Sequence, residues 1–178
     1  MLLIVFIPAW HLDEDDVVVA VGDHLSTWLE FHESSRWDQP RDRQFRLTGF
    51  ARAVPTWSGA ERGRHPTVVE TDGSTVYWDA PHPVTGPVDV TGVVSANNVD
   101  VPEGFPVTTG IVTRVRMEWQ DHWLGDDGAW HPVPGTARYE DLPSSYLPRE
   151  AAISPGGTTH ETWTGVLVDL EVMRDDSD

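Results

Sequence analysis

The chain has 178 residues, with 12 basic and 29 acidic side chains and a formal net charge of −17 at pH 7. Every basic residue is arginine, and there is no lysine and no cysteine. The missing lysine excludes Schiff-base and lysine-dependent phosphate chemistry, and the missing cysteine excludes thiol nucleophiles, disulfides and thiolate metal sites. The negative charge disfavours nucleic acids and anionic membranes as ligands, because both are polyanions.

Short β-type segments dominate the N-terminal half. Residues 2–7 are a continuous apolar run without the basic flank or cleavage site of a signal peptide, so we expect a buried strand. Residues 24–31 alternate with a period of two and predict a strand with one apolar face. Asp72-Gly73 supplies the positive φ of a tight turn and predicts a hairpin. Further strands are expected at residues 17–21, 45–53, 67–70 and 74–79.

The C-terminal half follows a segment with three prolines and a glycine, residues 80–87, which is the best internal boundary. We expect halves at 1–86 and 87–178, each similar to a small barrel, or a single domain. Residues 111–119 give the clearest strand signal, because apolar and mostly charged residues alternate; one face should cover the core and the other should be wet. Strands are also expected at 88–97 and 166–172, loops at 124–135 and 154–160, and a short helical turn within 137–147.

Four segments place Thr-Gly before an apolar residue at the start of a β-type run; their glycines are Gly49, Gly92, Gly110 and Gly165. Glycine lets a strand bend or bulge, as the curved strands of a small barrel require. The uneven spacing excludes a solenoid or propeller of fixed period. We therefore expect an all-β fold with minor helix, built as one elaborated or two fused small β-barrels of the OB or SH3-like kind.

Arginines concentrate in residues 36–64, which carry seven of them against three acidic residues. Guanidinium groups on two loops beside tryptophans can hold a phosphate, a carboxylate or an acidic patch of a partner. The alternative is that these arginines neutralise the acidic body from within, and that the tryptophan rings fold back over the barrel ends. The candidate ligand contacts are Arg36, Trp37, Arg43, Trp57, Arg62 and Arg64.

Eight histidines raise a metal hypothesis. Imidazole and carboxylate ligands suit Zn²⁺ or Fe²⁺, and such groups gather around the end of the clearest strand. No His-x-x-x-His or His-Glu-x-x-His spacing occurs, so scattered surface histidines are the alternative. The candidate metal ligands are Glu118, Asp121, His122 and His131.

Several segments resemble a known family. Residues 9–12 and the run Val21-Gly22-Asp23-His24-Leu25-Ser26-Thr27-Trp28 resemble the opening of an uncharacterised actinobacterial family of acidic proteins, a DUF6578-like domain of unknown function. Residues 106–115 and 163–170 resemble its later strands. Where that family tends to carry a cysteine pair, this chain has the acidic residues 13–16. The resemblance implies a β-rich fold and a high-GC bacterial source, and it implies no activity, cofactor or site.

These patterns favour a non-enzymatic binding or interaction module of the cytoplasm, whose partner is a protein or a small anionic ligand. The alternatives are a metal-dependent enzyme and an acidic protein that mimics DNA and binds a basic partner. Sugar binding through loop tryptophans is a further hypothesis. No cofactor is indicated, and no segment approaches the roughly 20 apolar residues of a membrane-spanning helix.

Overall fold

The computed structural model describes residues 1–14, 18–33, 40–97, 102, 104–146 and 159–173. They form ten strands in one sheet, a short α-helix and a 3₁₀ turn, which confirms the all-β class. No helix in these ranges is long and apolar enough to cross a membrane. The strands are β1 (Leu2–Pro8), β2 (His24–Glu33), β3 (Gln44–Ala53), β4 (His65–Glu70), β5 (Thr75–Ala80), β6 (Gly86–Asn97), β7 (Thr108–Leu124), β8 (Trp130–Pro132), β9 (Arg138–Leu142) and β10 (Thr159–Val172); the helices are α1 (Ala9–Glu14) and the 3₁₀ helix η1 (Arg41–Arg43).

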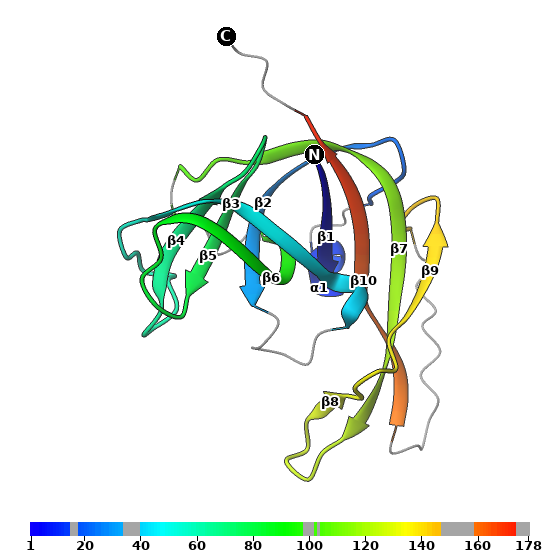
Figure 1. Ribbon diagram of the computed structural model, residues 1–178. Helices are drawn as coiled ribbons and strands as arrows, with labels where there is room; N and C mark the ends of the chain where they lie inside the picture. Colours follow the sequence, from blue (N-terminus) through cyan, green and yellow to red (C-terminus); the bar gives the residue numbers. More distant parts are fainter. Residues whose placement is uncertain (15–17, 34–39, 98–101, 103, 147–158, 174–178) are drawn as a thin grey trace.

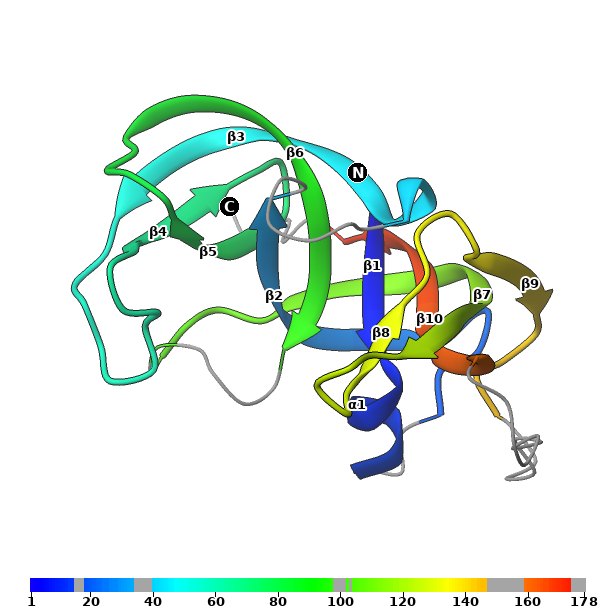
Figure 2. The same cartoon turned by 90° about the horizontal axis from the view of Figure 1, so that it is seen from below.

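Eight strands close into a barrel in the order β10-β1-β6-β3-β4-β5-β2-β7, and β7 pairs back to β10 (Figure 1). Long curved strands, such as the neighbours β3 and β6, form part of its wall (Figure 2). β2 and β6 also pair with each other, so two smaller rings of strands share them. Strands from both halves of the chain pair directly, as β1 does with β10 and β2 with β7, so both halves contribute to one sheet.

Two apolar clusters lie on opposite sides of the barrel wall. Leu3, Val5 and Ile7 of β1 belong to the large cluster inside the barrel. Because successive residues of a strand point to opposite faces, Ile4 and Phe6 point outward. They join a second, smaller cluster with Val93, Leu167 and Tyr139. This outer cluster gives η1 and β9 a surface to pack against.

The four Thr-Gly glycines allow neighbouring strands to approach closely. At each of them an added Cβ would lie within 3.0 Å of a backbone carbonyl oxygen on the adjacent strand: Glu70 for Gly49, His32 for Gly92, Glu171 for Gly110 and Ile7 for Gly165. At Gly165, φ is +151° and the register between β10 and β7 shifts, which confirms the expected bulge at that glycine. At the other three, the missing side chain leaves room for a backbone.

Several local expectations are corrected by the structure. The helical turn expected within residues 137–147 is wrong, because Arg138–Leu142 pair with β7 as strand β9. The expected loops at 124–135 and 154–160 contain β8 and the start of β10. The helix α1 follows β1 where only a strand was expected, and it buries Leu12. Strands β8 and β9 form because β7 offers them backbone hydrogen-bond partners.

The central strand β7 departs from the expected wet face. Arg116 and Glu118 are buried: Arg116 forms an ion pair with Asp169 of β10, and Glu118 accepts hydrogen bonds from Arg43 of η1 and Tyr139 of β9. Strand β7 has one extra residue, Thr113, opposite the peptide bond between Asp169 and Leu170 of β10. The alternation of inward and outward side chains along β7 therefore shifts by one position there. Val112 therefore faces the core, although the alternation had placed the residues on either side of it there.

Candidate functional site

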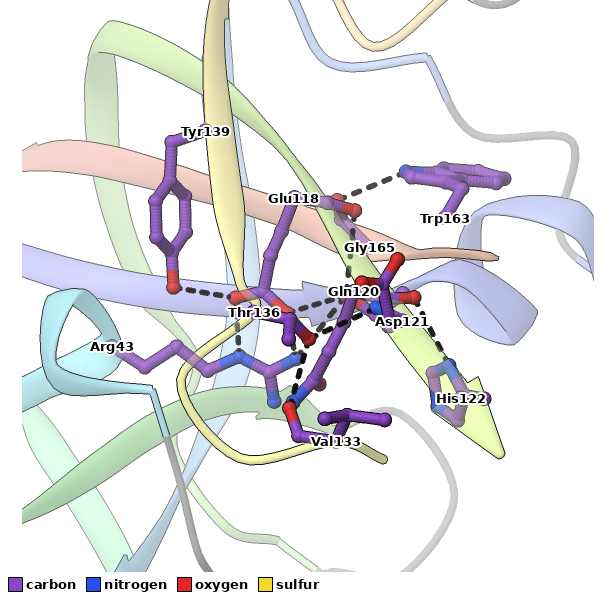
Figure 3. A network of polar contacts seen from close by, with 11 residues as sticks. Arg43, Glu118, Gln120, Asp121, His122, Val133, Thr136, Tyr139, Trp163 and Gly165 are labelled. Atoms are coloured by element: carbon purple, nitrogen blue, oxygen red, sulfur yellow. Dashed lines mark hydrogen bonds and ion pairs between the residues drawn. The ribbon is translucent and has the colours of Figure 1, made fainter. Parts of the chain in front are cut away.

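A polar network lies on the outer side of the barrel wall, between η1, β7, β9 and β10 (Figure 3). At its centre is the fully buried carboxylate of Glu118 on β7. Arg43 of η1 donates from Nε to Glu118 Oε2 at 2.6 Å and from Nη2 to Oε1. The Tyr139 hydroxyl donates to Oε2 at 2.9 Å, and the Thr164 hydroxyl donates to Oε1. Each carboxylate oxygen thus accepts two hydrogen bonds, which offsets the cost of taking the charge out of water.

The Arg43 side chain also anchors η1 to the barrel. Its guanidinium carbon lies 3.5 Å from the centroid of the Phe6 ring on β1, a cation–π geometry. Arg43 is only 8% exposed. The 3₁₀ turn is therefore held through Arg43 by two contacts, one with the Phe6 ring and one with the Glu118 carboxylate.

Buried Tyr77 and half-buried Tyr139 carry raised pKa values. Burial and, next, the Glu118 carboxylate raise the pKa of Tyr139. Burial likewise raises the pKa of Tyr77, whose hydroxyl donates to Asp79 Oδ1 at 2.7 Å. Both phenols therefore remain neutral hydrogen-bond donors well into the alkaline range.

These shifts predict an alkaline loss of stability. In the unfolded chain the tyrosines lose their protons near pH about 10, whereas the folded chain holds them, so raising the pH favours unfolding. The tyrosine contribution to the free energy of unfolding should be constant from neutral pH to about pH 10 and fall above it, as measured by urea denaturation along a pH series in that range. Tyr139→Phe should show a smaller fall, and a wild-type value that stays constant into the alkaline range would contradict the prediction.

A cavity of about 400 Å³ opens beside the network. Gln120 lies two residues after Glu118 on the same side of β7, and its side chain, 5% exposed, forms part of the cavity wall. The facing walls come from η1 and from the turn between β8 and β9. The lining residues are Pro40, Arg41, Asp42, Gln44, Gln120, Gly135 and Ala137.

The turn between β8 and β9 is tied to β7 by a set of hydrogen bonds (Figure 3). The Asp121 amide donates to Thr136 Oγ1 at 3.1 Å, and that hydroxyl donates to the Val133 carbonyl at 2.8 Å. Gln120 Nε2 donates to the same carbonyl at 3.3 Å. Both walls of the cavity are thus held in place by the protein itself, which lowers the ordering cost of binding.

Most arginines of the described residues already form ion pairs. The pairs are Arg43–Glu118, Arg46–Asp89, Arg52–Glu70, Arg64–Glu33, Arg114–Asp141, Arg116–Asp169 and Arg138–Glu161. Within the part of the chain that the structure describes, Arg41 and Arg62 have no carboxylate within 4.0 Å. Of these two, Arg41 lines the cavity.

The arginines expected to contact a ligand occupy different settings. Arg43 is part of the buried network, and Arg64 pairs with Glu33 at 3.1 Å. Arg62 is exposed. Arg36 lies outside the described residues. For Arg43 and Arg64, the structure shows the intramolecular pairing that was the alternative.

The tryptophan expected beside them is also engaged within the molecule. Trp57 Nε1 donates to the Tyr77 hydroxyl at 2.9 Å, and the two rings meet edge to face with centroids 6.1 Å apart. Trp57 thus folds back onto the buried Tyr77 of β5. Trp37 lies outside the described residues.

The candidate metal ligands do not form one cluster. Glu118 is bound by Arg43, and His131 Nε2 lies 3.0 Å from the Asp127 carboxylate. Asp121 and His122 are half-buried near the end of β7. Among the residues with described positions, no group of three or more histidine, aspartate or glutamate side chains lies where it could hold a metal ion.

Sequence reasoning did not single out Arg41, which lines the cavity, or Tyr139 and Thr164, which donate to Glu118. The last two come from β9 and β10, far along the chain, and no local pattern signals them. Gln120 carried a signal, because the period of two places it on the same strand face as Glu118 and His122.

A scan against protein-family models, a search of curated proteins and a search of solved structures found no match to this chain. The function is therefore inferred from the cavity and its side chains alone.

Proposed function

We propose that this protein is a binding module for a small polar ligand with an anionic group, held in the cavity between η1 and the β8–β9 turn. One observation carries the proposal: Arg41 lines this cavity and has no carboxylate within 4.0 Å among the described residues. The chain has a net charge of −17, so most of its arginines have acidic side chains available as partners. An arginine that lacks such a partner and lines a cavity is suited to bind an external anion.

The cavity has the size and chemistry of a small-molecule site. Its volume of about 400 Å³ lies in the range that such ligands occupy. Gln44 and Gln120 supply amide groups that both donate and accept hydrogen bonds, and Asp42 supplies an acceptor. The overall negative charge disfavours a large polyanion at the same place, so a small ligand fits better.

The Arg43–Glu118 pair supports this role by positioning η1. Arg41 is two residues from Arg43, whose side chain is bound on two sides by the barrel. Because η1 is held before the ligand arrives, little conformational entropy is lost on binding.

Replacing Arg41 tests the proposal. Inorganic phosphate and mono- and dicarboxylates of increasing size are titrated into the protein by calorimetry. We expect at least one of them to bind, and Arg41→Gln to weaken it about tenfold or more, because a charge-assisted hydrogen bond is lost. Arg62→Gln is the matched control, since Arg62 also lacks a described carboxylate partner but does not line the cavity. Equal affinities in wild type and Arg41→Gln, or equal losses in both variants, would contradict the proposal.

A further inference from the structure

The ends of β7, β8 and β10 extend away from the barrel (Figure 1), and two histidines lie close together on this extension. His122 of β7 and His160 of β10 are direct cross-strand partners, so their side chains lie on the same face of the extension. Their ring centroids are 6.0 Å apart, and the ring planes are inclined by 29°. Trp130 of β8 packs edge-on against His160, with centroids 4.0 Å apart.

We propose that His122 and His160 form a binding site for a divalent transition-metal ion of the Zn²⁺, Ni²⁺ and Cu²⁺ class. Two imidazoles that bind one ion through nitrogens at about 2.1 Å place their centroids roughly 5–6 Å apart. The centroid separation of 6.0 Å in the structure lies at the upper end of this range. Neutral imidazole suits these ions, whereas Mg²⁺ and Ca²⁺ prefer oxygen ligands.

The tautomer of His122 fits this role. Its Nδ1 lies 3.1 Å from the Gln120 carbonyl oxygen. A carbonyl can only accept, so Nδ1 carries the proton and the lone pair is at Nε2. A hydrogen bond of this kind commonly orients metal-binding imidazoles. In His160, Nδ1 is buried and has no hydrogen-bond partner within the described part of the chain, so no protein group engages this nitrogen.

The site has two protein ligands. The remaining histidine of the extension, His131, pairs across the ladder with Trp123, one position from His122 and thus on the opposite face. It lies against Asp127 there. Water or a further ligand would complete the coordination at His122 and His160. The net charge of −17 raises the local concentration of cations near them. This site uses different residues from the cavity and does not depend on the proposed function.

Metal titration of the tag-free protein tests the pair. Ni²⁺, Cu²⁺ and Zn²⁺ are titrated by calorimetry, with Mg²⁺ and Ca²⁺ for comparison. We expect one transition-metal ion per pair, with Cu²⁺ bound more tightly than Ni²⁺, and no comparable binding of Mg²⁺ or Ca²⁺. His122→Gln and His160→Gln should each lower the affinity by about tenfold or more. His131→Gln is the matched control and should retain the wild-type affinity.

Tryptophan emission supplies a second readout that locates the ion. Bound Cu²⁺ or Ni²⁺ should quench Trp130, because its ring contacts His160. Trp130→Phe should therefore keep the calorimetric affinity and lose most of the quenching. Circular dichroism establishes that each variant is folded. Wild-type affinity in folded His122→Gln and His160→Gln, or an equal loss in His131→Gln, would overturn the proposal, and neither outcome bears on anion binding at Arg41.

Discussion

Replacing Glu118 with alanine is expected to lower the free energy of unfolding by about 3–5 kcal/mol. The variant would leave the Arg43 guanidinium buried without an opposite charge, at 8% exposure. The hydroxyls of Tyr139 and Thr164 would lose their acceptor as well. Urea denaturation followed by tryptophan fluorescence measures the change. Because η1 would lose its anchor, anion binding at Arg41 should weaken in the same variant.

An exposed pair of similar geometry is the control for Glu118. Arg46 also donates from Nε and Nη2 to one carboxylate, that of Asp89, but the two side chains are 73% and 50% exposed. Asp89→Ala should therefore change stability little, because water solvates both charges. The double variant Arg43→Met, Glu118→Leu should recover much of the loss, since it removes both buried charges. A loss in Glu118→Ala no larger than in Asp89→Ala would contradict this account.

The second large effect is expected at Gly92, where alanine should cost about 2–3 kcal/mol of stability. An added Cβ would lie within 3.0 Å of the His32 carbonyl oxygen and of the Phe31 ring. Gly92 of β6 pairs with β2 on one edge and with β3 on the other, so neither strand can move without breaking ladder hydrogen bonds. Urea and thermal denaturation measure the loss.

Thr48→Ala is the control for Gly92→Ala. Thr48 lies on β3 beside another Thr-Gly glycine, but its side chain is exposed. Alanine has a lower β-propensity than threonine, so only a small decrease in the free energy of unfolding is expected. If Gly92→Ala were as stable as Thr48→Ala, β2 and β6 would have to separate freely at this point, contrary to the close approach in the structure.

The candidate site could be predicted only in part. Glu118 was singled out, but as a candidate metal ligand, and the arginine-rich segment contained Arg41 and Arg43. Nothing local showed that Arg43 would be buried and Arg41 left at a cavity. The difference arises because η1 packs one of its arginines onto Phe6 and Glu118, and both partners come from other strands.

The amino-acid sequence by itself determined the all-β class, the approximate positions of most barrel strands and the bulge at Gly165. These properties follow from local signals: a period of two, turn residues, and a glycine that lets a strand bulge. Only the tertiary structure decided that residues 138–142 form a strand, that most described arginines pair internally, and that a cavity opens beside Gln120. Burial and charge pairing depend on which distant segments meet, as Arg43 and Glu118 do across 75 positions, and no window of sequence contains both partners.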